Sequence, residues 1–386
     1  MHVKGFLHKM LLSVMHKKRL ATLTMLIETV LKTKRLSLAG LARGMDIPIQ
    51  ERSAIKRVDR FLGNQGLYAE RKNIYEIIAN RIIGNRENPW IIVDWSEVPN
   101  TTAHILRAAL MAKGRAITIY EEVHPERKLS NPKVEKKFLQ SLKTILPKEC
   151  RAVIVTDAGF HNKWFGEVLK LEWDYVGRVR CGKKYSSDGG KTWHKYTKLF
   201  SKATEVPQAL GKVKLCRTNS LETNLYIFKG KRKGRSLLNL LGKKRRDTNS
   251  MDQRKSAKEA WVLASSLTGR SMAKRVVKIY KMRMQIEEGF RDLKSSRYGF
   301  SFEDAYSRKR ERIEVLLLIA ALASLIAWLT GWLAERNNLH YQFQSNSIKK
   351  RRVLSLFYLG CRVISKEVKI PIKDLEEAID TGLIYA

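Results

Sequence analysis

Cysteine and acidic residues are scarce in this chain of 386 residues. Its four cysteines, Cys150, Cys181, Cys216 and Cys361, are far apart, and no CxxC motif or Cys/His cluster occurs. This spacing argues against structural zinc and against a disulfide framework, and it fits a reducing cytoplasm. Asp plus Glu number 37 against 75 Lys plus Arg, so the formal net charge is +38. Such an excess of positive charge indicates a polyanionic partner.

Internal repeats and low-complexity tracts are also absent, and 44% of the residues are apolar, which excludes a disordered chain. The first twenty residues contain apolar side chains but no small-residue cleavage site. Lys9, Lys17 and Lys18 interrupt any hydrophobic run. We therefore expect an amphipathic helix there rather than a signal peptide.

One long uncharged stretch, Val315 to Leu333, is present. Its length alone would allow it to span a membrane, which makes a membrane protein one alternative. A core helix covered on all sides has the same composition. Because the stretch stands alone in a strongly polar chain, we favour the core helix and expect no membrane partner.

Residues 1–85 have a helical, basic pattern and are predicted to form an all-α DNA-binding domain. Residues 36–45 place a small-residue turn between apolar positions, as a helix-turn-helix does. Over residues 55–62 the apolar side chains share one face, which leaves Lys56, Arg57 and Arg60 available for phosphates. An ordinary helical bundle with a solvated basic face is the alternative.

Short strands dominate from about residue 88. The expected order is three strands, a helix, a strand, a helix and a strand, which is typical of a ribonuclease-H-like α/β core. The first strand run ends in Asp94, and the strand over 152–156 ends at Asp157. The expected ranges are 90–93, 104–110, 116–120, 132–146, 152–156, 161–171 and 173–180.

Residues 181–268 break this pattern and predict a β-rich insertion. Its segment from Lys229 to Lys258 is very basic and is expected either to bind phosphates or to be a solvated loop. The predicted layout is therefore a core in two parts, 86–180 and 269–335, interrupted by 181–268. The N-terminal domain, 1–85, precedes this core, and a helical C-terminal region, 336–386, follows it.

A helix is predicted over about 273–296. At about 100° per residue, Tyr280, Arg283, Glu287 and Lys294 fall within about 60° of arc, beside an apolar stripe. An ordinary surface helix with i,i+4 ion pairs could show the same pattern.

Two acids make a catalytic interpretation stronger. Asp94 and Asp157 each follow a buried strand run, where a carboxylate is costly without a partner. A local turn is the usual reason, and a divalent cation is the other. Together with Glu287 the two aspartates predict a hard-oxygen site for Mg²⁺.

These residues carry a family resemblance. The pattern Tyr280-x₂-Arg283-x₃-Glu287-x₆-Lys294 resembles the Tyr-Arg-Glu-Lys signature of the insertion-sequence-four family of bacterial DDE transposases. The likeness extends over residues 55–64, 92–98, 106–110, 145–147, 154–160, 256–264 and 283–299.

The resemblance implies that Asp94, Asp157 and Glu287 form a triad that binds two Mg²⁺ or Mn²⁺ ions. It also implies that Tyr280, Arg283 and Lys294 contact phosphates of the transposon end. Trp261 would stack on a flipped base, unless it is an ordinary core strand residue. Some relatives have an aromatic residue after the signature arginine, where this chain has Met284.

The implied activity is cut-and-paste transposition of double-stranded DNA by a homodimer in the bacterial cytoplasm, associated with the nucleoid. A metal-dependent nuclease without strand transfer is one alternative, and an inactive DNA-binding remnant is the other.

Overall fold

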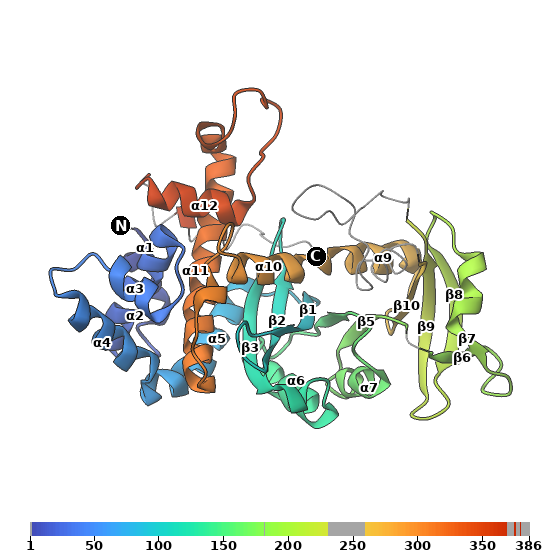
Figure 1. Cartoon of the computed structure of the whole chain (residues 1–386). Coiled ribbons are helices and arrows are strands. Elements are labelled where there is room, and N and C mark those ends of the chain that lie inside the picture. Colours follow the sequence, from blue (N-terminus) through green and yellow to red (C-terminus); the bar gives the residue numbers. More distant parts are fainter. Residues whose placement is uncertain (1, 181, 231–258, 369–373, 376–378, 380–386) are drawn as a thin grey trace, which may run out of the picture. The chain divides into compact units, whose positions relative to one another are not determined.

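The computed structural model describes residues 2–180, 182–230, 259–368, 374–375 and 379. The chain has a mixed α/β architecture and forms two compact units (Figure 1). Unit 1 contains Met1–Ala152 and Arg283–Ala386, and unit 2 contains Val153–Met282. The five-part domain layout expected from the sequence stays a prediction.

Unit 1 begins with five helices and a three-stranded meander. These elements are α1 (His2–Leu11), α2 (Lys17–Thr33), α3 (Leu38–Gly44), α4 (Glu51–Leu62), α5 (Gln65–Ile83), β1 (Trp90–Glu97), β2 (Ala103–Met111) and β3 (Ala116–Pro125). Its other elements are η1 (Glu126–Lys128), α6 (Pro132–Ile145), α10 (Met284–Lys294), η3 (Phe302–Asp304), α11 (Arg310–Arg336), η4 (Leu339–Phe343) and α12 (Leu356–Ser365).

Helices α3 and α5 begin directly after residues whose side chains cap them. The Ser37 hydroxyl accepts a hydrogen bond from the Gly40 amide at the start of α3, and Asn64 accepts one from the Leu67 amide at the start of α5. Helix α4 buries Ala54, Val58, Phe61 and Leu62.

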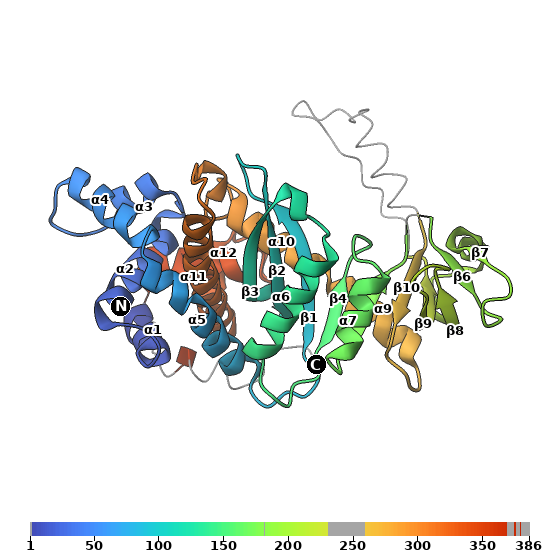
Figure 2. The same ribbon diagram turned by 90° about the horizontal axis from the view of Figure 1, so that it is seen from below.

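Strands β1, β2 and β3 form an antiparallel meander in which β2 is central. Helices α10 and α6 cover opposite faces of these strands (Figures 1 and 2). Strand β1 continues to Glu97, so Asp94 lies within it and does not end it. The expected end at Asp94 was wrong because pairing with β2 continues beyond the apolar run, with Asp94 opposite Arg107 and Glu97 opposite His104.

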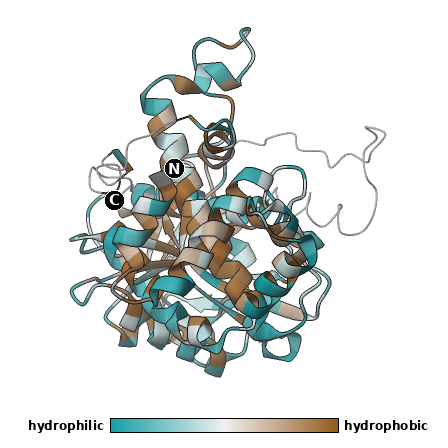
Figure 3. Ribbon diagram, turned by 90° about the vertical axis from the view of Figure 1, so that its left-hand side faces the viewer, coloured by the Kyte–Doolittle hydropathy of each residue, from teal (hydrophilic) through white to brown (hydrophobic). Residues whose placement is uncertain are grey.

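The uncharged stretch lies in α11, which is buried in the core of unit 1 as the core-helix interpretation predicted. Among the described residues α11 alone is long and apolar enough to cross a membrane, and 94% of its most apolar window is buried. Figure 3, coloured by residue hydropathy, shows hydrophobic residues mainly on central helical segments and hydrophilic residues mainly on peripheral ones. Helices α11 and α12 approach closely at Gly331 and Gly360, where an added Cβ would lie 1.9 Å from the Leu356 oxygen and 1.7 Å from the Ala327 oxygen, respectively.

Over its described residues, unit 2 is a sheet with three helical segments. Strand β4 pairs in parallel with β5, and the remaining order is β5-β10-β9-β8-β6-β7 with antiparallel pairing. The elements are β4 (Val153–Thr156), α7 (Asn162–Lys170), β5 (Asp174–Arg178), β6 (Lys184–Ser186), β7 (His194–Lys195), η2 (Tyr196–Lys202), β8 (Gln208–Leu215), β9 (Leu221–Phe228), β10 (Trp261–Ser265) and α9 (Met272–Met282).

The single helix expected over 273–296 is two helices, α9 and α10, separated at Arg283. The Arg283 backbone keeps right-handed helical angles, but the Ile286 amide donates to the Arg283 carbonyl in a tighter i+3 bond. Neither glycine nor proline marks this position in the sequence, so the prediction missed the interruption. The basic segment expected at 229–258 lies, from residue 231 on, outside the described residues.

Candidate active site

Strand β1 directs alternate side chains to α10 and to α6. Asp94 and Ser96 face α10, where they contact Arg283 and Lys294. Trp95 faces the other way, and its indole nitrogen donates to Glu135 of α6 at 3.4 Å. The period of two along a strand therefore places one acid and one hydroxyl beneath α10.

Arg283 lies between two of the predicted catalytic acids. Its Nη2 is 2.5 Å from Glu287 Oε1, and its Nη1 is 3.6 Å from Asp94 Oδ2. The Asp94 side chain is 16% exposed and that of Glu287 is 45% exposed. The Trp95 amide also donates to Asp94 Oδ1 at 2.9 Å. The structure thus orients two carboxylates toward one cationic group.

Lys294 lies at the other end of α10, on the same face. Its ammonium donates to Ser96 Oγ at 2.9 Å and lies 5.6 Å from the centre of the Phe290 ring. The pKa of Lys294 is lowered to about 8, chiefly by burial and also by the positive charge of Arg107, while Glu97 opposes the shift. A lysine with this pKa can be charged or neutral near physiological pH.

Arg107 of β2 packs against Phe290 of α10. Its guanidinium lies 4.4 Å from the centre of the Phe290 ring and donates through Nε to buried Glu121 at 2.8 Å. Sequence reasoning did not select Ser96 and Arg107 for the site. Two signals could have found them. Ser96 is a polar residue two positions after Asp94, so it lies on the same face of the strand, and Arg107 is a cation within the apolar run 105–110.

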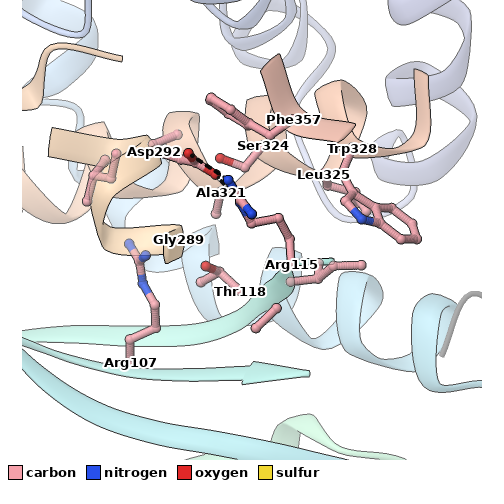
Figure 4. A pocket seen from close by; sticks show the side chains of 14 residues that line it. Arg107, Arg115, Thr118, Gly289, Asp292, Ala321, Ser324, Leu325, Trp328 and Phe357 are labelled. Atoms are coloured by element: carbon pink, nitrogen blue, oxygen red, sulfur yellow. Dashed lines mark hydrogen bonds and ion pairs between the residues drawn. The ribbon is translucent and has the colours of Figure 1, made fainter. Parts of the chain in front are cut away.

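The C-terminal half of α10 is held by a second ion pair. Arg115, which directly precedes β3, donates to Asp292 at 2.5 Å beside a cavity of about 30 Å³, which has room for one or two water molecules (Figure 4). Burial raises the pKa of Asp292, and the hydrogen bond from Arg115 opposes this shift. Together Arg107 and Arg115 fix the helix that carries Glu287 and Lys294.

In unit 2, Asp157 directly follows β4, where the sequence placed it. Its Oδ1 accepts a hydrogen bond from the Gly159 amide at 2.8 Å, which is the local turn considered as the alternative. A carboxylate accepts several hydrogen bonds or metal contacts, so this turn does not use up its capacity. His161 follows in the chain, and its pKa is lowered by burial and by Lys183, while Asp157 opposes the shift.

Trp261 and Tyr280 contact each other in unit 2. The centres of their rings are 5.0 Å apart in an edge-to-face arrangement, and the centre of the Phe228 ring lies 5.7 Å from that of Trp261. Trp261 begins β10 and is half-buried, whereas Tyr280 is buried. This aromatic group packs Trp261 against the sheet and leaves part of its surface exposed.

The remaining predicted DNA contacts are exposed. The Met284 side chain is 43% exposed at the start of α10, within reach of Arg283 Nη2. Lys56, Arg57 and Arg60 are exposed on α4. The structure therefore brings Asp94, Arg283, Glu287 and Lys294 together in unit 1. It describes Asp157, Trp261 and Tyr280 within unit 2.

The carboxylates fit a divalent metal ion by their chemistry. Asp94 and Glu287 supply hard oxygen donors, as Mg²⁺ and Mn²⁺ prefer, and both already face a shared cation. Within each unit the described residues include no group of three His, Cys, Asp or Glu side chains placed to hold a metal. A complete site therefore requires a donor beyond this pair.

Comparison with known proteins identifies the family. No curated protein matches the chain. A solved structure that is similar is described as the cryo-EM structure of piggyBac transposase synaptic complex with hairpin DNA. It is 12% identical, the match covers 100% of this chain and 83% of that chain, and the TM-score is 0.41. Residues 130–326, about half of the chain, match the family described as the transposase DDE domain, and this range includes Asp157 and α10. The protein therefore belongs to the transposase DDE domain family.

Proposed function

We propose that this DNA transposase moves its element by a cut-and-paste reaction. It binds the terminal inverted repeats, excises the element by strand nicking and hairpin formation and resolution, and joins the 3′ ends to target DNA. The observation that carries the proposal is that Arg283 contacts both Asp94 of β1 and Glu287 of α10. Family membership and the net charge of +38 support DNA as the substrate.

Asp94, Asp157 and Glu287 are the acids that would hold two Mg²⁺ or Mn²⁺ ions. Bound there, such ions supply charge stabilisation for the attacking and leaving oxygens of an in-line phosphoryl transfer. Nicking, hairpin formation, hairpin opening and target joining are all transfers of this kind, so one set of acids can serve all four steps.

The cationic side chains of α10 hold the DNA backbone in this proposal. Arg283 contacts a phosphate of the transposon end with donors that also face Asp94 and Glu287. Lys294, oriented by Ser96, contacts a second phosphate. Each phosphate contact shields the acids from substrate repulsion and aligns the scissile bond.

Aromatic and apolar side chains handle the unpaired base of the hairpin. The exposed part of Trp261 stacks on a flipped base, with Tyr280 holding the indole edge-on. The Tyr280 hydroxyl, buried in the free protein, reaches the adjacent phosphate after a local rearrangement on DNA binding. Met284 is exposed beside Arg283 and takes the place of the wedge that separates the base from its neighbour. The exposed cations of α4, Lys56, Arg57 and Arg60, contact the duplex of the terminal repeat.

The finer classification belongs to the same proposal. The Tyr-Arg-Glu-Lys spacing resembles that of the insertion-sequence-four family, and the chain resembles the transposase of transposon ten. We infer a ribonuclease-H-like core in the parts 86–180 and 269–335, interrupted by the insertion 181–268. A homodimer on two paired DNA ends, in the bacterial cytoplasm, completes the proposal.

Replacement of each acid tests the assignment. Asp94→Ala, Asp157→Ala and Glu287→Ala should each bind end DNA normally and give no Mg²⁺-dependent nicking of a plasmid that carries the element's ends. Nicking that survives one substitution removes that residue from the triad. A strand-transfer assay on the unmodified protein separates the transposase from a nuclease that only cuts, and absence of any cleavage indicates an inactive remnant.

A further inference from the structure

A loop of unit 1 carries a run of exposed cations outside the site described above. It connects η4 to α12, and it forms the loop at the top of the view in Figure 1. Lys349, Lys350, Arg351 and Arg352 follow one another in it, and the sequence from 337 to 366 contains no Asp or Glu. Positive charge is therefore concentrated there without compensation from neighbouring residues in the chain.

The loop is held in shape by one amide side chain. Gln344 Nε2 donates to the carbonyls of Ile348 at 2.8 Å and Arg351 at 3.0 Å. Gln344 Oε1 accepts from the Val353 amide at 3.1 Å. The Ile348 amide also donates to the Ser345 carbonyl at 3.2 Å. These hydrogen bonds fix the backbone conformation of the loop, so its side chains project from defined positions.

The four cations divide into one structural residue and three exposed ones. Arg352 is half-buried, and its Nε donates to Glu335 of α11 at 2.8 Å. Lys349, Lys350 and Arg351 are exposed, and no ion pair to an acid is described for them in the part of the chain that the structure covers. Three adjacent solvated cations on a fixed loop match the close spacing of phosphates along a nucleic acid backbone.

We propose that Lys349, Lys350 and Arg351 form an additional contact with the phosphate backbone of duplex DNA, independent of base sequence. This loop, residues 344–353, is termed the basic loop. The proposal rests on the proposed function for the identity of the polyanion. The DNA is either the transposon end or the target, since both offer the same phosphates.

The salt dependence of binding tests the basic loop. The test variant is the full-length triple substitution Lys349→Gln, Lys350→Gln and Arg351→Gln. The control variant carries Lys133→Gln, Lys137→Gln and Lys148→Gln, three exposed lysines elsewhere in unit 1. Binding of a 30-base-pair random duplex is measured by fluorescence anisotropy over a range of salt concentrations.

Each lost phosphate contact should reduce the slope of log K against log salt by about 0.9. We expect the basic-loop variant to lose about two to three units of slope and at least about tenfold in affinity at 0.1 M salt. A charge-preserving variant, Lys349→Arg with Lys350→Arg and Arg351→Lys, should bind like the unmodified protein. Slopes equal in the loop and control variants overturn the proposal, provided that their melting temperatures match.

Two further arms identify which DNA the loop contacts. One measures binding of a duplex that carries the terminal repeat, and the other measures capture of a plasmid by protein saturated with that duplex. If the basic-loop variant binds only the terminal-repeat duplex more weakly, the loop contacts the transposon end. If it only captures less plasmid, the loop contacts the target DNA. Plasmid nicking with Mg²⁺ is scored separately, so a protein that binds through the loop but never cuts refutes only the proposed function.

Discussion

Arg283 contacts Asp94 and Glu287 at the same time, through Nη1 at 3.6 Å and Nη2 at 2.5 Å. Asp94 comes from β1 and Glu287 from the first turn of α10, so one guanidinium connects a strand to a helix that are far apart in the sequence. The arrangement offsets the repulsion between two carboxylates. It also makes Arg283 a competitor of any divalent ion that the same acids bind.

Replacement of Arg283 should therefore separate metal binding from catalysis. We expect Arg283→Gln to bind Mn²⁺ about tenfold more tightly, because the acids lose their internal counter-ion, and to nick DNA at least about tenfold more slowly, because a phosphate contact is lost. Calorimetric Mn²⁺ titration measures the first effect and a nicking time course the second. Arg283→Lys is the control and should show a smaller change in both. Weaker Mn²⁺ binding by Arg283→Gln would contradict this account of the site.

The pKa of Lys294 predicts a pH dependence of DNA binding. Burial lowers the pKa to about 8, so the free protein loses this positive charge above that pH. A phosphate contact favours the charged form, so binding takes up a proton, and the Kd for end DNA should rise by up to about tenfold per pH unit above 8. Fluorescence anisotropy from pH 6 to 10 measures this. Lys294→Gln should bind more weakly at pH 7 and show a flatter profile, and an unchanged profile would exclude Lys294 as the titrating group.

Glu135 should make unit 1 less stable at neutral pH than in mild acid. Burial raises the pKa of Glu135 from 4.5 to about 7, and a hydrogen bond from Trp95 opposes the shift. The folded state therefore prefers the protonated acid, and stability falls as pH rises from about 4.5 to about 7. The full loss is about 3 kcal/mol. Glu135→Gln should raise the melting temperature at pH 8 and leave it nearly unchanged at pH 4.5. An equal effect at both values would show that the titration of Glu135 is not the cause.

Trp261 should affect the hairpin more than the first nick. The first cut needs no unpaired base, whereas the hairpin needs one stacked outside the duplex. We expect Trp261→Ala to slow hairpin formation by about tenfold or more relative to nicking, as measured on denaturing gels. Trp261→Phe keeps an aromatic face and should recover part of the rate. Equal slowing of both steps would assign Trp261 a structural role beside Tyr280 and Phe228.

Gly360 should be essential to the packing of α12 on α11. An added Cβ would lie 1.7 Å from the Ala327 carbonyl oxygen, so the helices must separate. Gly360→Ala should cost about 3 kcal/mol or more in the free energy of unfolding, measured by denaturant titration. Gly166 in helix α7 has no atom within 4 Å of an added Cβ, so Gly166→Ala is the control and should be neutral or slightly stabilising. If Gly360→Ala lowers the free energy of unfolding only slightly, the two helices can separate at little energetic cost.

Local sequence patterns predicted the elements around the site with fair accuracy. The expected helix at 132–146 is α6, and the strand before Asp157 is β4. Both have strong signals, a proline in the first turn of the helix and a continuous apolar run in the strand. The buried α11 was predicted as a core helix from composition alone.

Strand pairing and side-chain contacts between residues distant in the chain could not be predicted from the sequence. Strand β1 extends past Asp94 because β2 supplies partners, and no local pattern reports that pairing. The interruption at Arg283 has no glycine or proline to mark it. The support that Arg107 gives α10 depends on Phe290 and Glu121, which are distant in the chain. The triad assignment, which joins residues of both units, stays a prediction.

The burial of α11 sets an order for biosynthesis. Helix α11 packs on α2, α5 and β3, which are made long before it, and all of unit 2 is translated in between. Until residue 336 leaves the ribosome, the apolar faces of these earlier elements lack their native cover. Truncated translation products that stop within unit 2 should therefore expose apolar surface that promotes aggregation, and they should depend on chaperones. Helices α2 and α5 and strand β3 therefore reach their native packing only after α11 has been synthesised.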